Sequence, residues 1–146
     1  MRTLCIGLLL FGSTVAYADD TLERQIKNAF LTVSAFECAA IAPNDQERER
    51  LWNLGLQHGR DFIQFWKPNS DVREATWDQI PGIWSLVIKK GPTPDFILGM
   101  LYGSIALMAG EKLSIEGEPE FSLKLMEQNR ATMYREKNCA FLGKEP

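Results

Sequence analysis

Three cysteines constrain the fold of this 146-residue chain more than any other feature. Cys5 lies in an apolar segment at the N-terminus, whereas Cys38 and Cys139 lie near opposite ends of the remaining chain. Two cysteines in an oxidising compartment normally pair, the alternative being free or intermolecular thiols. A Cys38–Cys139 bridge would close a loop of about 100 residues, which by chain entropy stabilises a fold by about 4 to 5 kcal/mol. We therefore expect the last helix to be tied to the first.

The first 18 residues have the three parts of a secretory signal peptide. Arg2 supplies a positive charge, residues 4–15 are mostly apolar, and residues 16–18 read Ala-Tyr-Ala, as at a cleavage site. The apolar stretch is shorter than the roughly 20 residues of a membrane span. We expect cleavage after Ala18, which leaves one helical domain of residues 19–146 in the periplasm or outside the cell.

The composition is that of an ordinary globular domain, with 45% hydrophobic and 24% charged residues. The formal net charge is −3, and loss of Arg2 makes it one unit more negative. Because nucleic-acid binding depends on basic patches, we expect none here. Two cysteines and a single histidine do not supply the four ligands of a structural zinc site, so we expect no metal and no other cofactor.

Apolar residues recur every three or four positions along most of the mature chain, which predicts helices. The predicted helices cover residues 20–41, 45–67, 71–80, 96–109 and 119–141. Asn44 and Thr93 stand where the second and fourth helices would begin, and both are good N-cap residues. Residues 83–88 suit a helical turn or a strand, and we favour helix because no second strand exists to pair with it.

The segment 96–109 carries no charge, so its helix is apolar on every side. Such a helix is a membrane span or the centre of a bundle, and this one is too short to span. Gly99 and Gly103 repeat the spacing of Gly55 and Gly59, which predicts that these two helices cross closely. We expect an all-α, single-domain irregular bundle of four to five helices around a central apolar helix, with one disulfide.

Glu37 and Asp61 are candidates for acid–base chemistry. Glu37 has apolar or small neighbours along the chain, and a buried carboxyl group could act as the general acid of a glycan-cleaving enzyme. Asp61 would supply the second carboxylate that such an enzyme needs. The alternatives for Glu37 are exposure at the edge of the helix or a salt bridge to an arginine, of which the chain offers Arg60, Arg130 and Arg135.

His58 is the only histidine and lies on the apolar face of its predicted helix. It could exchange protons, or bind haem or a metal together with Met100 or Met108. The alternative is a core histidine with one hydrogen bond.

Trp77 and two loops are candidates for contact with a partner. Trp77 has a charged neighbourhood, which favours exposure. One loop carries Lys89 and Lys90, and the other carries Glu116 and Glu118. Each loop is equally compatible with a solvated turn.

The sequence contains no recognisable nucleophile or phosphate-binding motif, since Ser104 falls inside a predicted helix. Catalysis usually leaves more clustered polar residues than this, so an enzyme is the less favoured reading. We expect a small exported protein that binds a macromolecular partner, a protein of the cell envelope, as an inhibitor, immunity protein or accessory factor. The alternatives are a peptidoglycan- or glycan-cleaving enzyme using Glu37, and a carrier of a small apolar ligand or haem. We expect no membrane span in the mature chain.

Overall fold

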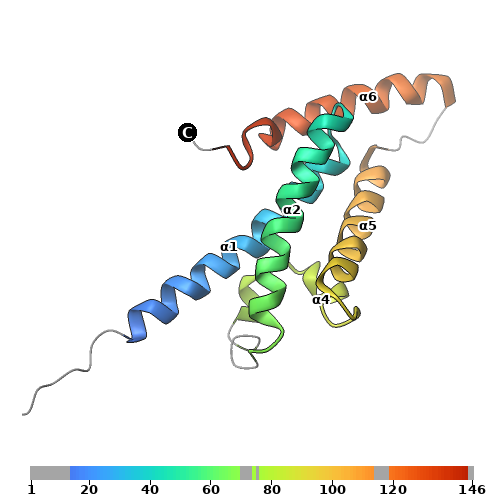
Figure 1. The fold of residues 1–146 in the computed structure, drawn as a ribbon. Coiled ribbons are helices and arrows are strands. Elements are labelled where there is room, and N and C mark those ends of the chain that lie inside the picture. The colour runs from blue at the N-terminus through green and yellow to red at the C-terminus, as the bar shows by residue number, and fades with distance from the viewer. Residues whose placement is uncertain (1–13, 70–73, 75, 114–118, 145–146) are drawn as a thin grey trace, which may run out of the picture.

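A computed structural model shows a chain made of helices (Figure 1). It describes residues 14–69, 74, 76–113 and 119–144. The elements in chain order are α1 (Thr14–Ala40), α2 (Asp45–Trp66), η1 (Trp77–Gln79), α4 (Trp84–Val87), α5 (Pro94–Leu113), α6 (Pro119–Glu136) and η2 (Cys139–Phe141), where η marks a 3-10 helix. The described residues contain no strand, and the predicted all-α bundle is confirmed.

The helices α1 and α2 form an antiparallel pair that supports the rest of the fold (Figure 1). The helix α5 packs on both of them, α4 lies against α5, and α6 crosses the end where α1 finishes and α2 begins. The predicted starts of α2 and α5 are confirmed. Asn44 Oδ1 accepts from the Glu47 amide at 2.8 Å, and Thr93 Oγ1 accepts from the Phe96 amide at 3.3 Å.

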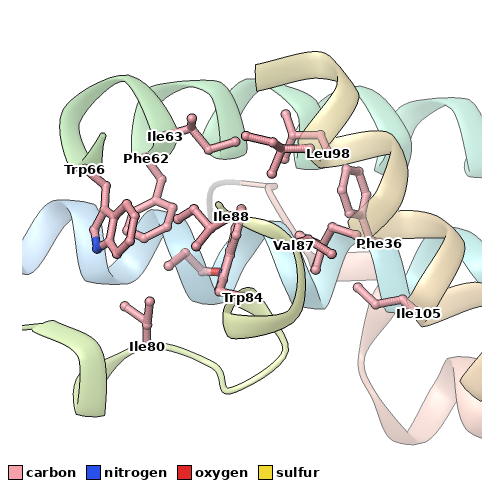
Figure 2. Packing of buried hydrophobic residues seen from close by; sticks show 13 residues of the cluster. Phe36, Phe62, Ile63, Trp66, Ile80, Trp84, Val87, Ile88, Leu98 and Ile105 are labelled. Atoms are coloured by element: carbon pink, nitrogen blue, oxygen red, sulfur yellow. The ribbon is translucent and has the colours of Figure 1, made fainter. Parts of the chain in front are cut away.

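The main core lies between α1, α2, α4 and α5 (Figure 2). Trp84 from α4 is fully buried, with its ring 4.9 Å from that of Phe62 and its indole N–H donating to the Ala29 carbonyl at 3.2 Å. Val87, three residues later, is buried beside it, which is helical spacing. Residues 84–87 therefore form a helix, which the sequence favoured over a strand, because the side chains of Trp84 and Val87 must reach the same core.

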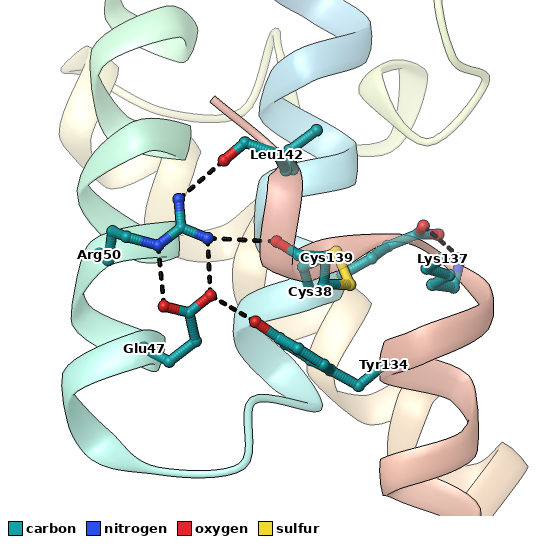
Figure 3. The surroundings of a disulfide bond; sticks show 8 residues. Cys38, Glu47, Arg50, Tyr134, Lys137, Cys139 and Leu142 are labelled. Atoms are coloured by element: carbon teal, nitrogen blue, oxygen red, sulfur yellow. Dashed lines mark hydrogen bonds and ion pairs between the residues drawn. A yellow bond between two sulfur atoms is a disulfide. The ribbon is translucent and has the colours of Figure 1, made fainter. Parts of the chain in front are cut away.

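A second, smaller core surrounds the predicted disulfide (Figure 3). Cys38 and Cys139 are bonded, with their Cα atoms 5.5 Å apart. Buried residues around the bridge come from α1 and the turn after it, from α2 and from the end of α5, and include Ile41, Leu51 and Leu113. Met133 and Tyr134 of α6 pack against them. The bridge and this cluster hold α6 on the end of the bundle.

Several helix boundaries differ from the sequence-based expectation. The helix α5 runs on to Leu113, past the predicted end at residue 109, so it is longer than the sequence indicated. The helix α1 begins at Thr14 and runs through the predicted cleavage position after Ala18, so the start expected at residue 20 applies only to a cleaved chain. The helix α6 ends at Glu136 instead of residue 141, because Asn138 adopts a left-handed conformation, with φ 53°, and Cys139 falls in η2. Of the helix predicted over 71–80, residues 71–73 and 75 lie outside the described residues, positions 74 and 76 are helical, and residues 77–79 form η1.

The predicted close approach of α2 and α5 is found at Gly59, but the predicted pairing of the two sets of glycines is wrong. A Cβ atom built on Gly59 would clash with Leu98 of α5 and lie 3.0 Å from Thr32 Cγ2, so α2 does use its glycines for close approach. Gly99 and Gly103 have nothing within 4 Å of such an atom. The helix α5 turns Leu98, not its glycines, toward α2, because a leucine fills the space beside Gly59 and buries more apolar surface.

The helix α5 contacts α1, α2, α4 and α6, so it is central in the bundle. Only five of its 20 residues are buried, namely Ile97, Leu98, Leu101, Ile105 and Leu113. On its outer side Phe96 is 51% and Leu107 73% exposed. Among the described helices, α5 alone is long and apolar enough to cross a membrane by length and composition, so the absence of a span stays a prediction.

Candidate functional site

Glu37 is neither buried nor paired with an arginine. Its side chain is 39% exposed, and its carboxylate accepts from Lys137 Nζ at 2.7 Å (Figure 3). Arg60, one of the expected partners, pairs instead with Asp95 at 2.7 Å. Lys137 reaches Glu37 because the neighbouring Cys38 is bonded to Cys139, two residues after this lysine.

The structure does not bring Glu37 and Asp61 to one cleft. Glu37 lines a pocket between α1, α5 and α6, whereas Asp61 lines a different pocket on the surface of α1 and α2. A glycan-cleaving enzyme needs two carboxyl groups that face the same bond. The geometry of these two residues therefore gives the glycan-cleaving alternative no support.

His58 and Asp61 do meet, in an open pocket of about 740 Å³ that Arg24, Lys27 and Asn28 also line. His58 Nδ1 lies 2.8 Å from Asn28 Oδ1. The Asn28 side-chain nitrogen donates to Gln25 Oε1 at 3.2 Å. This bond turns Asn28 Oδ1 toward the imidazole of His58. His58 therefore donates from Nδ1, and its Nε2 is the acceptor in the neutral ring.

Partial burial lowers the pKa of His58, with Lys27 adding to this effect and Asp61 opposing it. The ring is accordingly neutral at pH 7 and could accept a proton at Nε2. No serine, cysteine or methionine is among the described residues that line this pocket, so neither a hydroxyl or thiol nucleophile of these types nor the proposed haem ligands Met100 and Met108 lie beside it. His58 fits the alternative of a partly buried histidine with one hydrogen bond.

Trp77 and the basic loop lie together. The Trp77 ring is 38% exposed and tilted against Trp66, with ring centroids 5.9 Å apart. Lys89 Nζ lies 5.3 Å from the Trp77 ring centroid, a cation–π distance, and Lys90 is exposed. Glu116 and Glu118 lie outside the described residues. Among the described side chains, no three His, Cys, Asp or Glu residues are grouped as metal ligands.

A polar cluster that joins α2 to the C-terminal segment is not apparent from the sequence (Figure 3). The Arg50 guanidinium donates to Glu47, to the Leu142 carbonyl at 2.7 Å and to the Cys139 carbonyl at 3.1 Å. The Tyr134 hydroxyl donates to Glu47. Hydrogen bonds lower the pKa of Glu47 to about 2, those from Arg50 more than the one from Tyr134. The pKa of Tyr134 is raised to about 12, mainly by burial and to a smaller extent by its interaction with Glu47. The i, i+3 spacing of Glu47 and Arg50 is the one feature of the sequence that indicates an ion pair here.

The outer face of α5, defined as Phe96, Gly99, Gly103 and Leu107, carries exposed apolar side chains at both of its ends. These residues are three or four apart, so they form one stripe along the helix. The two glycines leave a low stretch of open backbone between the projecting Phe96 and Leu107. Such an arrangement can accept the backbone of another helix at close range.

Comparison of the chain with protein families, with curated proteins and with solved structures finds no match. A functional assignment therefore rests on the geometry of the chain itself.

Proposed function

We propose that this chain is an exported, non-enzymatic protein that binds an apolar helical segment of another protein in the cell envelope. The observation that carries the proposal is the outer face of α5, which is apolar along its length although the fold leaves it in water. Apolar faces of this kind on small soluble proteins commonly mark interaction sites.

Burial of this face would contribute favourably to binding. Phe96 and Leu107 are 51% and 73% exposed, and complete burial of one such side chain is worth about 1.5 to 3 kcal/mol. Between them, Gly99 and Gly103 would let a partner helix approach without displacing side chains. A helical partner therefore fits the shape of the face as well as its polarity.

The charges beside this face favour a protein partner over a lipid surface. Asp95 lies in the first turn of α5, where it pairs with Arg60, and Glu111 stands near the end of the helix; both acids are exposed. Helices that lie on anionic membranes usually carry several lysines or arginines on their polar side, whereas α5 carries Lys112 alone.

Two features support the proposed export to the cell envelope. The first 18 residues have the pattern of a signal peptide, and the Cys38–Cys139 bridge suits an oxidising environment. Both support the proposal that envelope proteins are the neighbours of the mature chain.

Photo-crosslinking in intact cells tests the proposal. A photoreactive amino acid at position 107 should give an adduct of discrete size, whereas the same group at position 123 should not. Leu123 is the matched control because it is 70% exposed on α6, away from the outer face of α5. Adding Gly103→Leu should abolish the adduct at position 107, since it fills the low stretch without meeting another part of the fold.

Equal labelling at positions 107 and 123 would overturn the proposal. Labelling of lipid alone at position 107 would also overturn it, and would assign the face to a membrane surface instead.

A further inference from the structure

A second apolar surface lies between α1, α5 and α6, where the chain forms a partly open pocket of about 260 Å³. The volume is close to the lower end of the range for small-molecule sites. Aliphatic and thioether side chains form most of its wall, among them Val33, Ile41, Ile83, Ile105, Met108 and Met133. An alkyl group would find contacts there on several sides.

The polar residues of this pocket are one acid and two lysines. Glu37 and Lys137 form an ion pair of 2.7 Å, so their charges offset one another. Lys112 is exposed and makes no ion pair with any side chain that the structure describes. The pocket therefore combines an apolar wall with one excess positive charge.

We propose that this pocket binds a small amphipathic carboxylate, with its alkyl chain against the apolar wall and its head group at Lys112. Lys137 can also donate to the head group while it holds Glu37, because an ammonium group has three donors. The volume suits a short or medium alkyl chain and excludes a ligand as large as haem. Each methylene group that enters the pocket should raise the affinity about fourfold until the pocket is full.

The disulfide completes this pocket. Met133 and Lys137 come from α6 or directly after it, and Cys139 fixes that segment to Cys38, next to Glu37. Reduction of the bridge would remove the covalent link that holds one wall in place. Ligand binding should therefore weaken under reducing conditions.

The test is a calorimetric titration of the oxidised protein, recovered from cells that express the full chain, with decanoate below its micellar concentration. Saturable binding of one equivalent is expected. Decyltrimethylammonium has a decyl chain with the opposite charge and should bind at least tenfold more weakly. Lys112→Gln should weaken decanoate binding about tenfold, whereas Lys124→Gln, which makes the same charge change on α6 outside the pocket, should not.

Ala109→Leu would place a larger side chain in the pocket and should abolish binding with an unchanged circular dichroism spectrum. Leu107→Ser on the outer face of α5 should leave decanoate binding unchanged, so this proposal and the proposed function can fail separately. Three results would overturn the inference: no saturable binding, equal affinity for the cationic amphiphile, or equal weakening by Lys112→Gln and Lys124→Gln.

Discussion

The ring of Phe36 lies where a side chain at position 55 would have to go. A Cβ atom built on Gly55 would be 2.5 Å from Phe36 Cδ1, well inside van der Waals contact. The ring cannot easily move, because it is fully buried, stacked 5.1 Å from Trp52 and edge-on at 5.5 Å to Tyr102. The close packing of α1 on α2 therefore requires glycine at this position.

Gly55→Ala should lower the free energy of unfolding by about 1 to 3 kcal/mol, because overpacking of the core outweighs the better helix propensity of alanine. Gly99→Ala is the matched control, since its new methyl group would meet open space in α5. It should raise the free energy of unfolding by up to about 1 kcal/mol. Urea denaturation measures both, and a change of the same sign in the two variants would contradict the packing described here.

The double variant Cys38→Ser, Cys139→Ser should lose about 4 kcal/mol of stability, since the bridge joins residues 101 apart. The loss should appear in urea denaturation under oxidising conditions, and the unaltered protein should show a similar loss after reduction. Cys5→Ser should leave the stability of the exported protein unchanged, because this residue belongs to the predicted signal peptide. A loss below about 1 kcal/mol in the double variant would mean that the bridge contributes little.

The pKa of Glu47 predicts acid sensitivity. It lies at about 2 in the folded chain, against an ordinary value of 4.5. Between these values the unfolded chain binds a proton that the folded chain does not, so the free energy of unfolding should fall as pH falls from about 4.5 toward 2. Glu47→Gln should flatten that slope, measured by urea denaturation across this range.

Tyr134→Phe removes one hydrogen bond to Glu47 and should cost about 1 kcal/mol at pH 7. It should also reduce, without abolishing, the acid-induced loss of stability, because Arg50 remains bonded to Glu47. Tyr102→Phe is the control, since the described contacts of Tyr102 are made by its ring. Equal losses in the two variants would contradict the role assigned to the Tyr134 hydroxyl.

His58 should titrate below its ordinary pKa of 6.5. As pH drops, the His58 of the unfolded chain takes up a proton at a higher pH than that of the folded chain. The free energy of unfolding should therefore fall as pH drops through 6.5 toward the folded pKa, and His58→Gln should remove this dependence. The chain has a single histidine, so its imidazole proton signals in an NMR titration report the pKa directly. Asn28→Asp should raise that pKa, because a carboxylate would then face Nδ1. A midpoint above 6.5 in the unaltered chain would contradict the burial of the ring.

Local sequence was enough to place most helices and their starts. The amide of Asn44 and the hydroxyl of Thr93 bind backbone groups three residues away, so their effect depends on neighbours that the sequence shows directly. The disulfide was equally accessible, because the predicted loss of Cys5 with the signal peptide would leave two cysteines and one way to pair them within the chain.

The orientation of α5 and the partner of Glu37 were decided by tertiary structure. A helix that is apolar on every side has no periodic signal to say which side is buried, so only packing against α1, α2 and α4 turned Leu98 inward and left Leu107 exposed. Lys137 meets Glu37 across 100 residues because a covalent bond fixes the last turn beside the first helix. Helix caps and the hydrogen bonds within a helix act over three or four residues and can be read along the chain, whereas contacts between distant segments depend on how complete surfaces fit together.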